Sequence, residues 1–298
     1  MSIQEEIKNK AKVIDEIIET FLPKEEGMQK LIMEAMNYSI HVGGKRLRPM
    51  LMEESYKMFG GKDKIIEPFM AAIEMIHTYS LVHDDLPAMD NDEYRRGQLS
   101  THAKYGHAMG VLAGDGLLNY AFETALKSFD FTEDREEMVR VSKALKVLSN
   151  KAGIYGMVGG QVVDVLSENQ PIGMDTIKYI HENKTAAMIE SSLMIGAILA
   201  GAKENEVSLM EQVGSDVGLA FQIQDDILDV TSTQEVLGKP IGSDEKNGKT
   251  TYLTLVGLEQ ARIDVKEISE RAINNVKSLS NKNDFLVELI DSLITRES

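Results

Sequence analysis

Residues 213–229 read VGSDVGLAFQIQDDILD, and the periodicity of this stretch decides the fold class. At about 100° per residue, its apolar side chains gather on one side of a helix and its polar side chains on the other. The apolar side consists of Val213, Val217, Ala220, Phe221, Ile223, Ile227 and Leu228. The opposite arc, about 100° wide, holds Gln222, Asp225, Asp226 and Asp229. We therefore predict an amphipathic helix here.

The segment 73–85 behaves differently, because its apolar residues point in nearly every direction around a helix. This pattern is typical of a central helix buried on all sides. No run of alternating apolar and polar residues bounded by turn dipeptides indicates a strand. Only six prolines occur, and residues 88–170 and 172–239 contain none, so long helices are possible. We predict an all-α protein with one domain over residues 1–298, because no linker-like stretch interrupts it.

Composition narrows the function classes. The 298 residues include 48 acidic and 32 basic side chains, a formal net charge of −16, which argues against nucleic-acid binding. Cysteine is absent, which excludes disulfides and thiol nucleophiles and fits a reducing, cytoplasmic location. The longest small and apolar run, Leu193–Ala202, covers about half of a membrane span, and the N-terminus is acidic where a secretory signal is basic. We expect no membrane span.

Two aspartate clusters follow apolar helical segments, at residues 84–90 (DDLPAMD) and 225–229 (DDILD). In the second, Asp225 and Asp229 are four residues apart, so their carboxylates share one helix face. Like charges this close repel unless a cation lies between them, and ligation by oxygen alone suits Mg²⁺. In the first, Asp84 and Asp90 converge only if Pro87 breaks the helix.

A single cluster of this kind is more often a solvated helix end, since charge runs are usually solvent faces. Two clusters, each after an apolar helix, favour a metal site instead. A calcium loop is disfavoured because neither cluster has the spacing of an EF-hand.

Basic residues are scarce but concentrate in a few segments, which are 43–49 (GGKRLRP), 95–97 (RRG), 184, 239 and 249. Arginine forks bind phosphate oxygens bidentately, so acidic clusters with arginines nearby are typical of a site for a diphosphate and metal ions. Arg95 follows Asp90 by five residues, and one loop can therefore present metal ligands and phosphate donors to the same pocket. Taken alone, segment 45–48 is more typical of an exposed helix start.

Five strings together resemble the trans-prenyl diphosphate synthases, most closely the bacterial farnesyl diphosphate synthases (geranyltranstransferases). These strings are GGKRLRP (43–49), HDDLPAMDND with RRG (83–97), GGQVVD (159–164), KT (184–185) and FQIQDDILD (221–229). They occur in family order between about residue 40 and residue 252, and the combination of both aspartate motifs with the arginines is highly specific. The first 25 and last 40 residues carry no motif that we can use.

The resemblance implies a helical bundle around a deep central active-site cavity (the isoprenoid synthase fold), with both aspartate motifs facing each other across its mouth, and a homodimer. It implies a prenyltransferase with Mg²⁺ as cofactor, three ions per active site. The reaction would join isopentenyl diphosphate to dimethylallyl diphosphate and then to geranyl diphosphate, giving farnesyl diphosphate and releasing diphosphate.

The resemblance also assigns roles to individual residues. It makes the main metal ligands Asp84, Asp90 and Asp225, with Asp85, Asp226 and Asp229 in support. It assigns four residues to the isopentenyl diphosphate pocket, which are Lys45, Arg48, His77 and Arg96. It places in the allylic diphosphate pocket Arg95, Lys184, Thr185, Gln222, Lys239 and Lys249, of which the catalytic set is Arg95, Lys184, Thr185 and Gln222. Without the family pattern, a lone histidine such as His77 would be interpreted as a core residue.

Chain length depends on where the cavity ends. Tyr79 precedes Asp84 by five residues, about 7.5 Å along a helix, and an aromatic ring there resembles the cavity floor of bacterial farnesyl synthases. The helix wheel instead favours Ser80, about 40° from Asp84, over Tyr79, about 140° away. Both residues are candidates for this role.

Other functions fit parts of the pattern. A geranylgeranyl or longer-chain synthase would share all the motifs, whereas a class I terpene cyclase normally has a different second metal motif. A non-catalytic regulatory subunit of a prenyltransferase tends to lack one aspartate motif, and both are present here. An acidic calcium-binding scaffold would bind calcium without turnover.

Overall fold

The computed structural model describes residues 2–231 and 250–295, and within these ranges a single two-stranded hairpin is the only sheet. The all-α prediction is confirmed. The chain divides into two compact units: Met1–Glu53 with Lys62–Leu145, and Glu54–Gly61 with Lys146–Ser298. One domain over residues 1–298 stays a prediction.

Helices make up most of the first unit. They are α1 (Ile3–Glu19), α2 (Lys30–His41), α4 (Glu67–Asp84), α5 (Thr101–Tyr105), α6 (His107–Leu126) and the short 3-10 helices η1 (Lys64–Ile66) and η2 (Lys127–Phe131). The boundaries between the units fall within two further helices, α3 (Leu47–Met58) and α7 (Arg135–Ala152).

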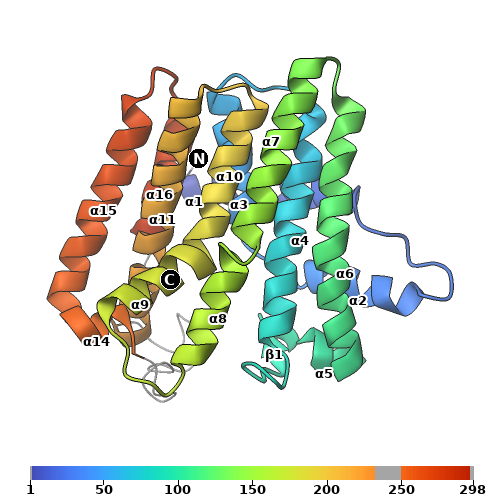
Figure 1. The fold of residues 1–298 in the computed structure, drawn as a ribbon, viewed down its shortest axis with the longest axis horizontal. Coiled ribbons are helices and arrows are strands. Elements are labelled where there is room, and N and C mark those ends of the chain that lie inside the picture. Colours follow the sequence, from blue (N-terminus) through green and yellow to red (C-terminus); the bar gives the residue numbers. More distant parts are fainter. Residues whose placement is uncertain (1, 232–249, 296–298) are drawn as a thin grey trace. The chain divides into compact units, whose positions relative to one another are not determined.

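Helix α4 is the core helix of the first unit. Pro68 lies in its first turn, where the missing N–H costs no hydrogen bond. Twelve of its 18 residues are buried, as the sequence pattern predicts for a helix that is apolar all round. It packs along α6 (Figure 1), and Gly114 of α6 leaves room for the ring of His83, which a Cβ at this position would overlap.

The same helix is the one segment, among the described residues, that is long and apolar enough to cross a membrane. The segment Lys64–Asp84 contains an 18-residue window with a mean hydropathy of 1.2. Because 78% of this window is buried inside the structure, its apolar side chains are already covered by protein. Burial in a protein core therefore explains its composition.

A short β-hairpin follows α4, and here the prediction that no strand forms is wrong. Strands β1 (Tyr94–Arg95) and β2 (Gln98–Leu99) pair antiparallel. The loop between them is Arg96-Gly97, with φ values of 51° and 77°. Positive φ at both loop residues is what a type I′ hairpin turn requires. Strands of two residues are too short to produce an alternating pattern in the sequence.

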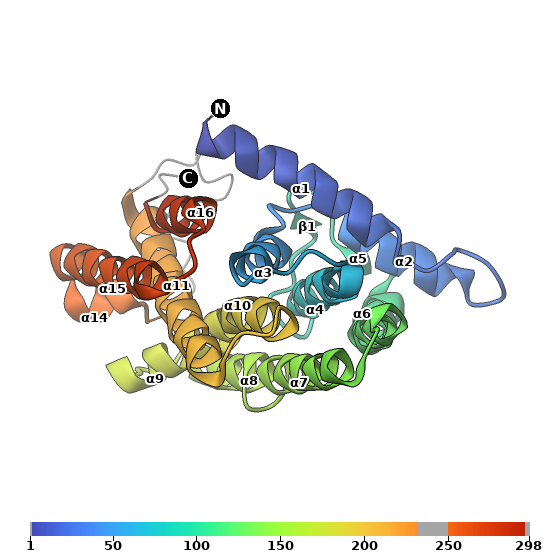
Figure 2. The ribbon, with the colours of Figure 1, turned by 90° about the horizontal axis from the view of Figure 1, so that it is seen from above.

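The second unit is also helical. It contains α8 (Met157–Ser167), α9 (Met174–Ile180), the π-helix η3 (His181–Ala186), α10 (Ala187–Leu199), α11 (Glu204–Thr231), α14 (Tyr252–Val256), α15 (Leu258–Ser278) and α16 (Asp284–Ile294). Helix α11 lies between α10 and α15 (Figure 2) and packs against both. Helix α10 is the most buried, with 12 of its 13 residues inside.

Two buried carboxylates in the second unit, Glu190 and Asp216, are paired across these helices. Lys151 of α7 donates to Glu190 of α10 and to Glu211 of α11, the latter at 2.6 Å. Arg271 of α15 binds the carboxylate of Asp216 of α11 through two nitrogens, at 2.9 and 2.6 Å. A charge removed from water without such a partner would destabilise the fold, so these pairs are necessary once the charges are buried.

The helix predicted at residues 213–229 is confirmed as part of α11, but its polar side is not uniformly exposed. Gln222 and Asp225 are half-buried. Asp226 and Asp229 are only 7% and 5% exposed. The cause at Asp226 is α14, whose first backbone N–H, that of Tyr252, donates to Asp226 Oδ2 at 2.9 Å. The polar arc of the helix thus faces other protein groups in part.

Candidate active site

The first aspartate cluster forms the end of α4 and the turn after it. The helix ends at Asp84, and the backbone N–H of Asp90 donates to the carbonyl of Asp84 at 2.9 Å. Asn91, with a φ of 55°, closes the turn by donating its N–H to the Leu86 carbonyl at 3.1 Å. The helix break that Asp84 and Asp90 require is therefore present around Pro87, and it brings the backbones of these two predicted metal ligands together.

The second aspartate of this cluster is held by the hairpin. The Arg95 guanidinium donates through Nε to both oxygens of Asp85, each at 2.9 Å, and through Nη2 to Oδ1 at 2.6 Å. The Asp85 side chain is 3% exposed, and burial raises its pKa although Arg95 opposes this shift. Arg95 thus neutralises a buried carboxylate next to Asp84, which fits a supporting position for Asp85.

Cationic and histidine side chains gather beside α4 in the first unit. Burial lowers the pKa of His77 well below its usual value, and the charges of Arg48 and Arg96 lower it further, so this imidazole is neutral near pH 7. Nε of Arg48 is buried without a hydrogen-bond partner among the described residues. The Arg96 guanidinium lies against Gly44, where a Cβ would come within 2.8 Å of Nη1. Lys45 follows Gly44 and is exposed.

These positions bring Arg48, His77 and Arg96 into one region, with Lys45 on an adjoining segment. The region carries crowded positive charge, which an anion such as a diphosphate would relieve.

The two candidates for the cavity floor differ in their surroundings. Tyr79 is 6% exposed, and its ring packs edge-on against the His83 ring with centroids 5.7 Å apart. Burial raises the pKa of Tyr79 to about 12, with a contribution from the charge of Asp84. Ser80 is half-buried, and its hydroxyl donates to the His77 carbonyl at 2.9 Å. The large, fixed side chain is therefore that of Tyr79.

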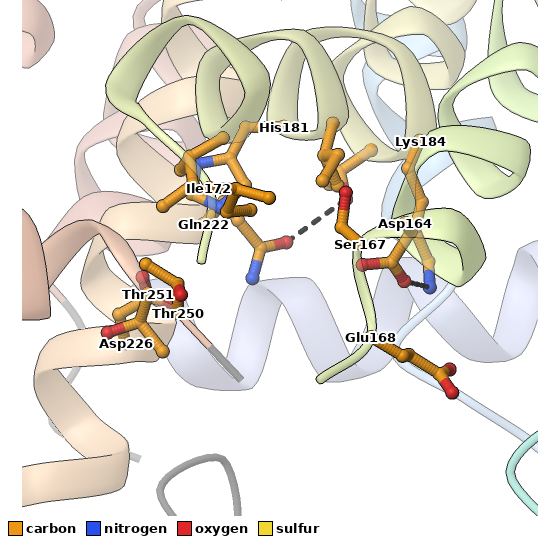
Figure 3. A pocket seen from close by; sticks show the side chains of 13 residues that line it. Asp164, Ser167, Glu168, Ile172, His181, Lys184, Gln222, Asp226, Thr250 and Thr251 are labelled. Carbon is orange, nitrogen blue, oxygen red and sulfur yellow. Dashed lines mark hydrogen bonds and ion pairs between the residues drawn. The ribbon is translucent and has the colours of Figure 1, made fainter. Parts of the chain in front are cut away.

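The second unit contains a cavity of about 170 Å³, shown in Figure 3. The Lys184 Nζ donates to Asp164 Oδ2 at 2.6 Å, and the Thr185 hydroxyl donates to Gln222 Oε1 at 3.0 Å. The structure thus places Lys184, Thr185 and Gln222 on the wall of one cavity. The full lining consists of Asp164, Ser167, Glu168, Ile172, Ile177, Ile180, His181, Lys184, Thr185, Gln222, Asp226, Thr250 and Thr251.

Close packing of glycines against η3 positions this wall. A Cβ at Gly160 of α8 would overlap the backbone nitrogen of Lys184, and one at Gly218 of α11 would overlap the Ala186 side chain. Both neighbouring helices can therefore approach the π-helix closely, and α8 brings Asp164 within reach of Lys184. π-Helical turns are rare overall, but those that occur often lie at functional sites. The location of η3 on the wall of this cavity agrees with that tendency.

His181 also lines this cavity, and its only signal in the sequence is its position three residues before Lys184. It is 8% exposed, and its Nδ1 has no hydrogen-bond partner among the described residues. Its ring stacks on that of Tyr252, with centroids 6.5 Å apart. Burial lowers its pKa to about 4, against a small opposing effect of Asp164. His181 is therefore neutral at pH 7.

The second aspartate cluster lies on α11. Asp225 is half-buried, whereas Asp226 is engaged by the backbone of α14 and Asp229 is buried. In residues 2–231 and 250–295, no three histidine, aspartate or glutamate side chains form a ready-made metal cluster. Mg²⁺ does not need one, because it usually binds through one or two carboxylates together with substrate phosphates and water.

The donor atoms of the two aspartate clusters are of the type that Mg²⁺ prefers. Both clusters offer only carboxylate oxygens from aspartate, and hard oxygen ligands are what this ion prefers. Two further predicted residues of the allylic pocket, Lys239 and Lys249, lie outside the described residues.

Three comparisons with known proteins agree with one another. The family model for polyprenyl synthetase matches residues 29–290. A farnesyl diphosphate synthase of Geobacillus stearothermophilus is 40% identical over 265 residues, covering 88% of this chain and 87% of the relative. A geranylgeranyl diphosphate synthase of Cyanophora paradoxa is 40% identical over 289 residues, covering 95% of this chain and 94% of the relative.

Among solved structures, a geranyltransferase of Helicobacter pylori complexed with magnesium and isoprenyl diphosphate has a TM-score of 0.83 and 30% identity. The similarity covers 99% of this chain and 97% of that one. The fold is therefore the all-α fold of the isoprenyl diphosphate synthases.

Proposed function

The chain belongs to the polyprenyl synthetase family and is a prenyltransferase of isoprenoid biosynthesis, and we propose that its product is farnesyl diphosphate. The substrates in this proposal are isopentenyl diphosphate with dimethylallyl diphosphate, and then with geranyl diphosphate. Relatives named farnesyl and geranylgeranyl synthases match at the same identity, so overall similarity does not select the product.

The observation that carries the farnesyl product is the position of Tyr79. Its buried ring lies on α4 five residues before Asp84 and is fixed against His83. The ring lies about 7.5 Å along the helix axis from Asp84, so a chain that grows along α4 from a diphosphate held near Asp84 would meet it. A bulky, fixed aromatic side chain at this position resembles the cavity floor of bacterial farnesyl synthases, and this resemblance favours a 15-carbon over a 20-carbon product.

For the metal, we assign the main ligand positions to Asp84, Asp90 and Asp225, with three Mg²⁺ ions in each active site. Asp85, Asp226 and Asp229 would support them, since Arg95 and the α14 backbone already engage the first two. When bound, Mg²⁺ supplies positive charge that stabilises the diphosphate leaving group. That both motifs face one shared cavity is part of the proposal.

The two diphosphates would bind to different sets of side chains. The crowded cationic region of Lys45, Arg48, His77 and Arg96 suits isopentenyl diphosphate, because a bound anion relieves repulsion there. Lys184, on the wall of the second unit's cavity, suits the allylic diphosphate, and Arg95 and the two lysines at 239 and 249 complete that proposed set.

In the reaction, the allylic carbon–oxygen bond breaks and its electron pair leaves with the diphosphate. The oxygens of Thr185 and Gln222 stabilise the carbocation by their dipoles, and the isoleucines of the cavity wall exclude water that would quench it. The isopentenyl double bond then forms the new carbon–carbon bond to the cation. A proton leaves the isopentenyl unit for the departed diphosphate, which restores a double bond. No side chain acts as a nucleophile.

We also propose a homodimer in the cytoplasm. Large apolar side chains are exposed on α8 and just before it, with Tyr155 76%, Leu166 72%, Ile154 68% and Val162 51% exposed. Exposed apolar side chains in such number are typical of an interface. Light scattering after gel filtration would give the mass of a dimer. The cytoplasmic location is supported by the absence of cysteine.

The function is tested by incubating the purified chain with radiolabelled isopentenyl diphosphate and each allylic primer, with Mg²⁺ or with EDTA. We expect a 15-carbon product that disappears with EDTA. The Asp225→Asn variant should lose turnover, whereas the control Asp130→Asn, at an exposed aspartate of η2, should not. A 20-carbon product would make the chain a geranylgeranyl synthase. Absence of turnover with every primer would indicate a regulatory subunit and contradict the proposal.

A further inference from the structure

A buried ion pair in the first unit has no part in the reaction described above. Arg46 and Glu74 are 4% and 2% exposed, and Nη1 of Arg46 donates to Glu74 Oε1 at 2.7 Å. Removing two charges from water costs nearly as much free energy as their attraction returns, so such a pair is weak evidence for a purely stabilising role.

Arg46 connects three helices through one guanidinium. Besides Glu74 on α4, its Nε donates to Asp15 Oδ1 on α1 at 2.7 Å. Its Nη2 donates to the carbonyl of Ile40, near the end of α2, at 2.8 Å. All three nitrogens of the planar fork are used, which fixes the side chain in one orientation.

This anchor holds an unusual backbone. Arg46 has a φ of 50°, in the left-handed region that non-glycine residues seldom adopt and keep only when their surroundings enforce it. Lys45 precedes Arg46, and Arg48 follows two residues later in the first turn of α3. Because peptide units are planar, the dihedral angles of Arg46 set the directions in which Lys45 and Arg48 leave this segment.

Glu74 faces the same cationic region from α4. It lies one helical turn before His77, so the two side chains share a face of the helix. Its negative charge raises the pKa of Arg48 and of Arg96, in opposition to burial, which lowers both. Glu74 thus partly offsets the crowded positive charge of these arginines while its own carboxylate is bound to Arg46.

We propose that Arg46 and Glu74 are positioning residues for the isopentenyl diphosphate pocket, and that Asp15 extends this anchor to the N-terminal helix α1. The inference rests on the proposed function, because it takes Lys45, Arg48, His77 and Arg96 as the pocket. It gives the N-terminal helix, which carries no family motif, a role in substrate binding.

The decisive variant is Arg46→Lys, since lysine keeps the charge but replaces the planar fork with a single ammonium. We expect the KM for isopentenyl diphosphate to rise roughly tenfold, while kcat and the KM for the allylic diphosphate change less than about threefold. A merely structural role would lower the melting temperature without this division between the two substrates. Equal changes in both KM values would overturn the proposal.

A milder variant guards against failure of Arg46→Lys to fold. Asp15→Asn removes the outer partner, whose side chain is 52% exposed, and should raise the KM for isopentenyl diphosphate about two- to fivefold. Its matched control is Glu16→Gln, which removes the same charge from the adjacent, exposed position of α1. If Asp15→Asn behaves like Glu16→Gln, α1 has no part in the anchor and that portion of the inference is wrong.

Calorimetry with isopentenyl diphosphate alone separates this inference from the proposed function. Binding by the wild-type chain that weakens in Arg46→Lys supports the anchor even if no product forms, in which case only the proposed function fails. Turnover by the wild-type chain with equal binding by both proteins refutes the anchor and leaves the function intact. No binding by the wild-type chain refutes both.

Discussion

Replacing Tyr79 with alanine should lengthen the product by one isoprene unit. The next large buried side chains on this face of α4 are Ile76 and Met75, three and four residues earlier, so the floor would recede by about 4.5–6 Å. Four further bonded carbons extend a chain by about 5 Å, judged from the reach of about 3.5 Å for the three backbone bonds of a residue. The deeper cavity therefore accommodates 20 carbons and not 25.

Product length is measured by mass spectrometry of the dephosphorylated alcohols, with geranyl diphosphate as the primer. Tyr79→Phe keeps the ring and should leave a 15-carbon product, and Ser80→Ala should do the same. Because Tyr79 is 6% exposed, its loss should destabilise the fold by about 3–5 kcal/mol, so circular dichroism must first show a folded variant. A folded Tyr79→Ala enzyme that still stops at 15 carbons would refute this reasoning, and a longer product from Ser80→Ala would transfer the role to Ser80.

Two further predictions concern the second unit. Burial lowers the pKa of His181 to about 4. Between pH 6.5 and 4 the unfolded chain therefore binds a proton that the folded chain does not, so the free energy of unfolding decreases as the pH falls, by up to about 3 kcal/mol. Urea unfolding at pH 7.5 and 5.0 should show a smaller decrease for His181→Gln, and an equal decrease in both proteins would contradict the shift. Gly160→Ala should separate α8 from η3, because its Cβ overlaps the backbone nitrogen of Lys184, and should therefore lower both kcat and the melting temperature. The control is Gly173→Ala, where a Cβ meets nothing within 4 Å, and it should change neither quantity.

Helical periodicity was sufficient to predict the class of fold but not the environment of every polar residue. The pattern around Tyr79 correctly predicted a core helix, because a helix that is apolar all round must be buried. The polar arc of α11 was misleading at Asp226, since a helix wheel does not show that a distant backbone N–H, that of Tyr252, covers the carboxylate. Such tertiary hydrogen bonds are invisible to local patterns.

The candidate site was predictable to a similar extent. The family motifs indicated Lys184, Thr185 and Gln222, which the structure brings to one cavity wall. They did not distinguish Arg46 from its basic neighbours, because the sequence GGKRLRP does not reveal which arginine turns inward. His181 was missed because its buried, unpartnered nitrogen is a property of packing. The hairpin was missed because Arg96 occupies a position where asparagine or glycine is usual.

The π-helix has a consequence for comparison and engineering of this protein. A π-turn contains one residue more than the α-helical turn it replaces, which rotates everything beyond it by about 100°. An aligned relative lacking that additional residue would present a different side chain to Asp164, even at high identity. Deleting one of residues 181–183 should restore an ordinary helical turn and redirect Lys184, so grafts of segment 174–199 onto another scaffold must carry the additional residue together with the glycines opposite it.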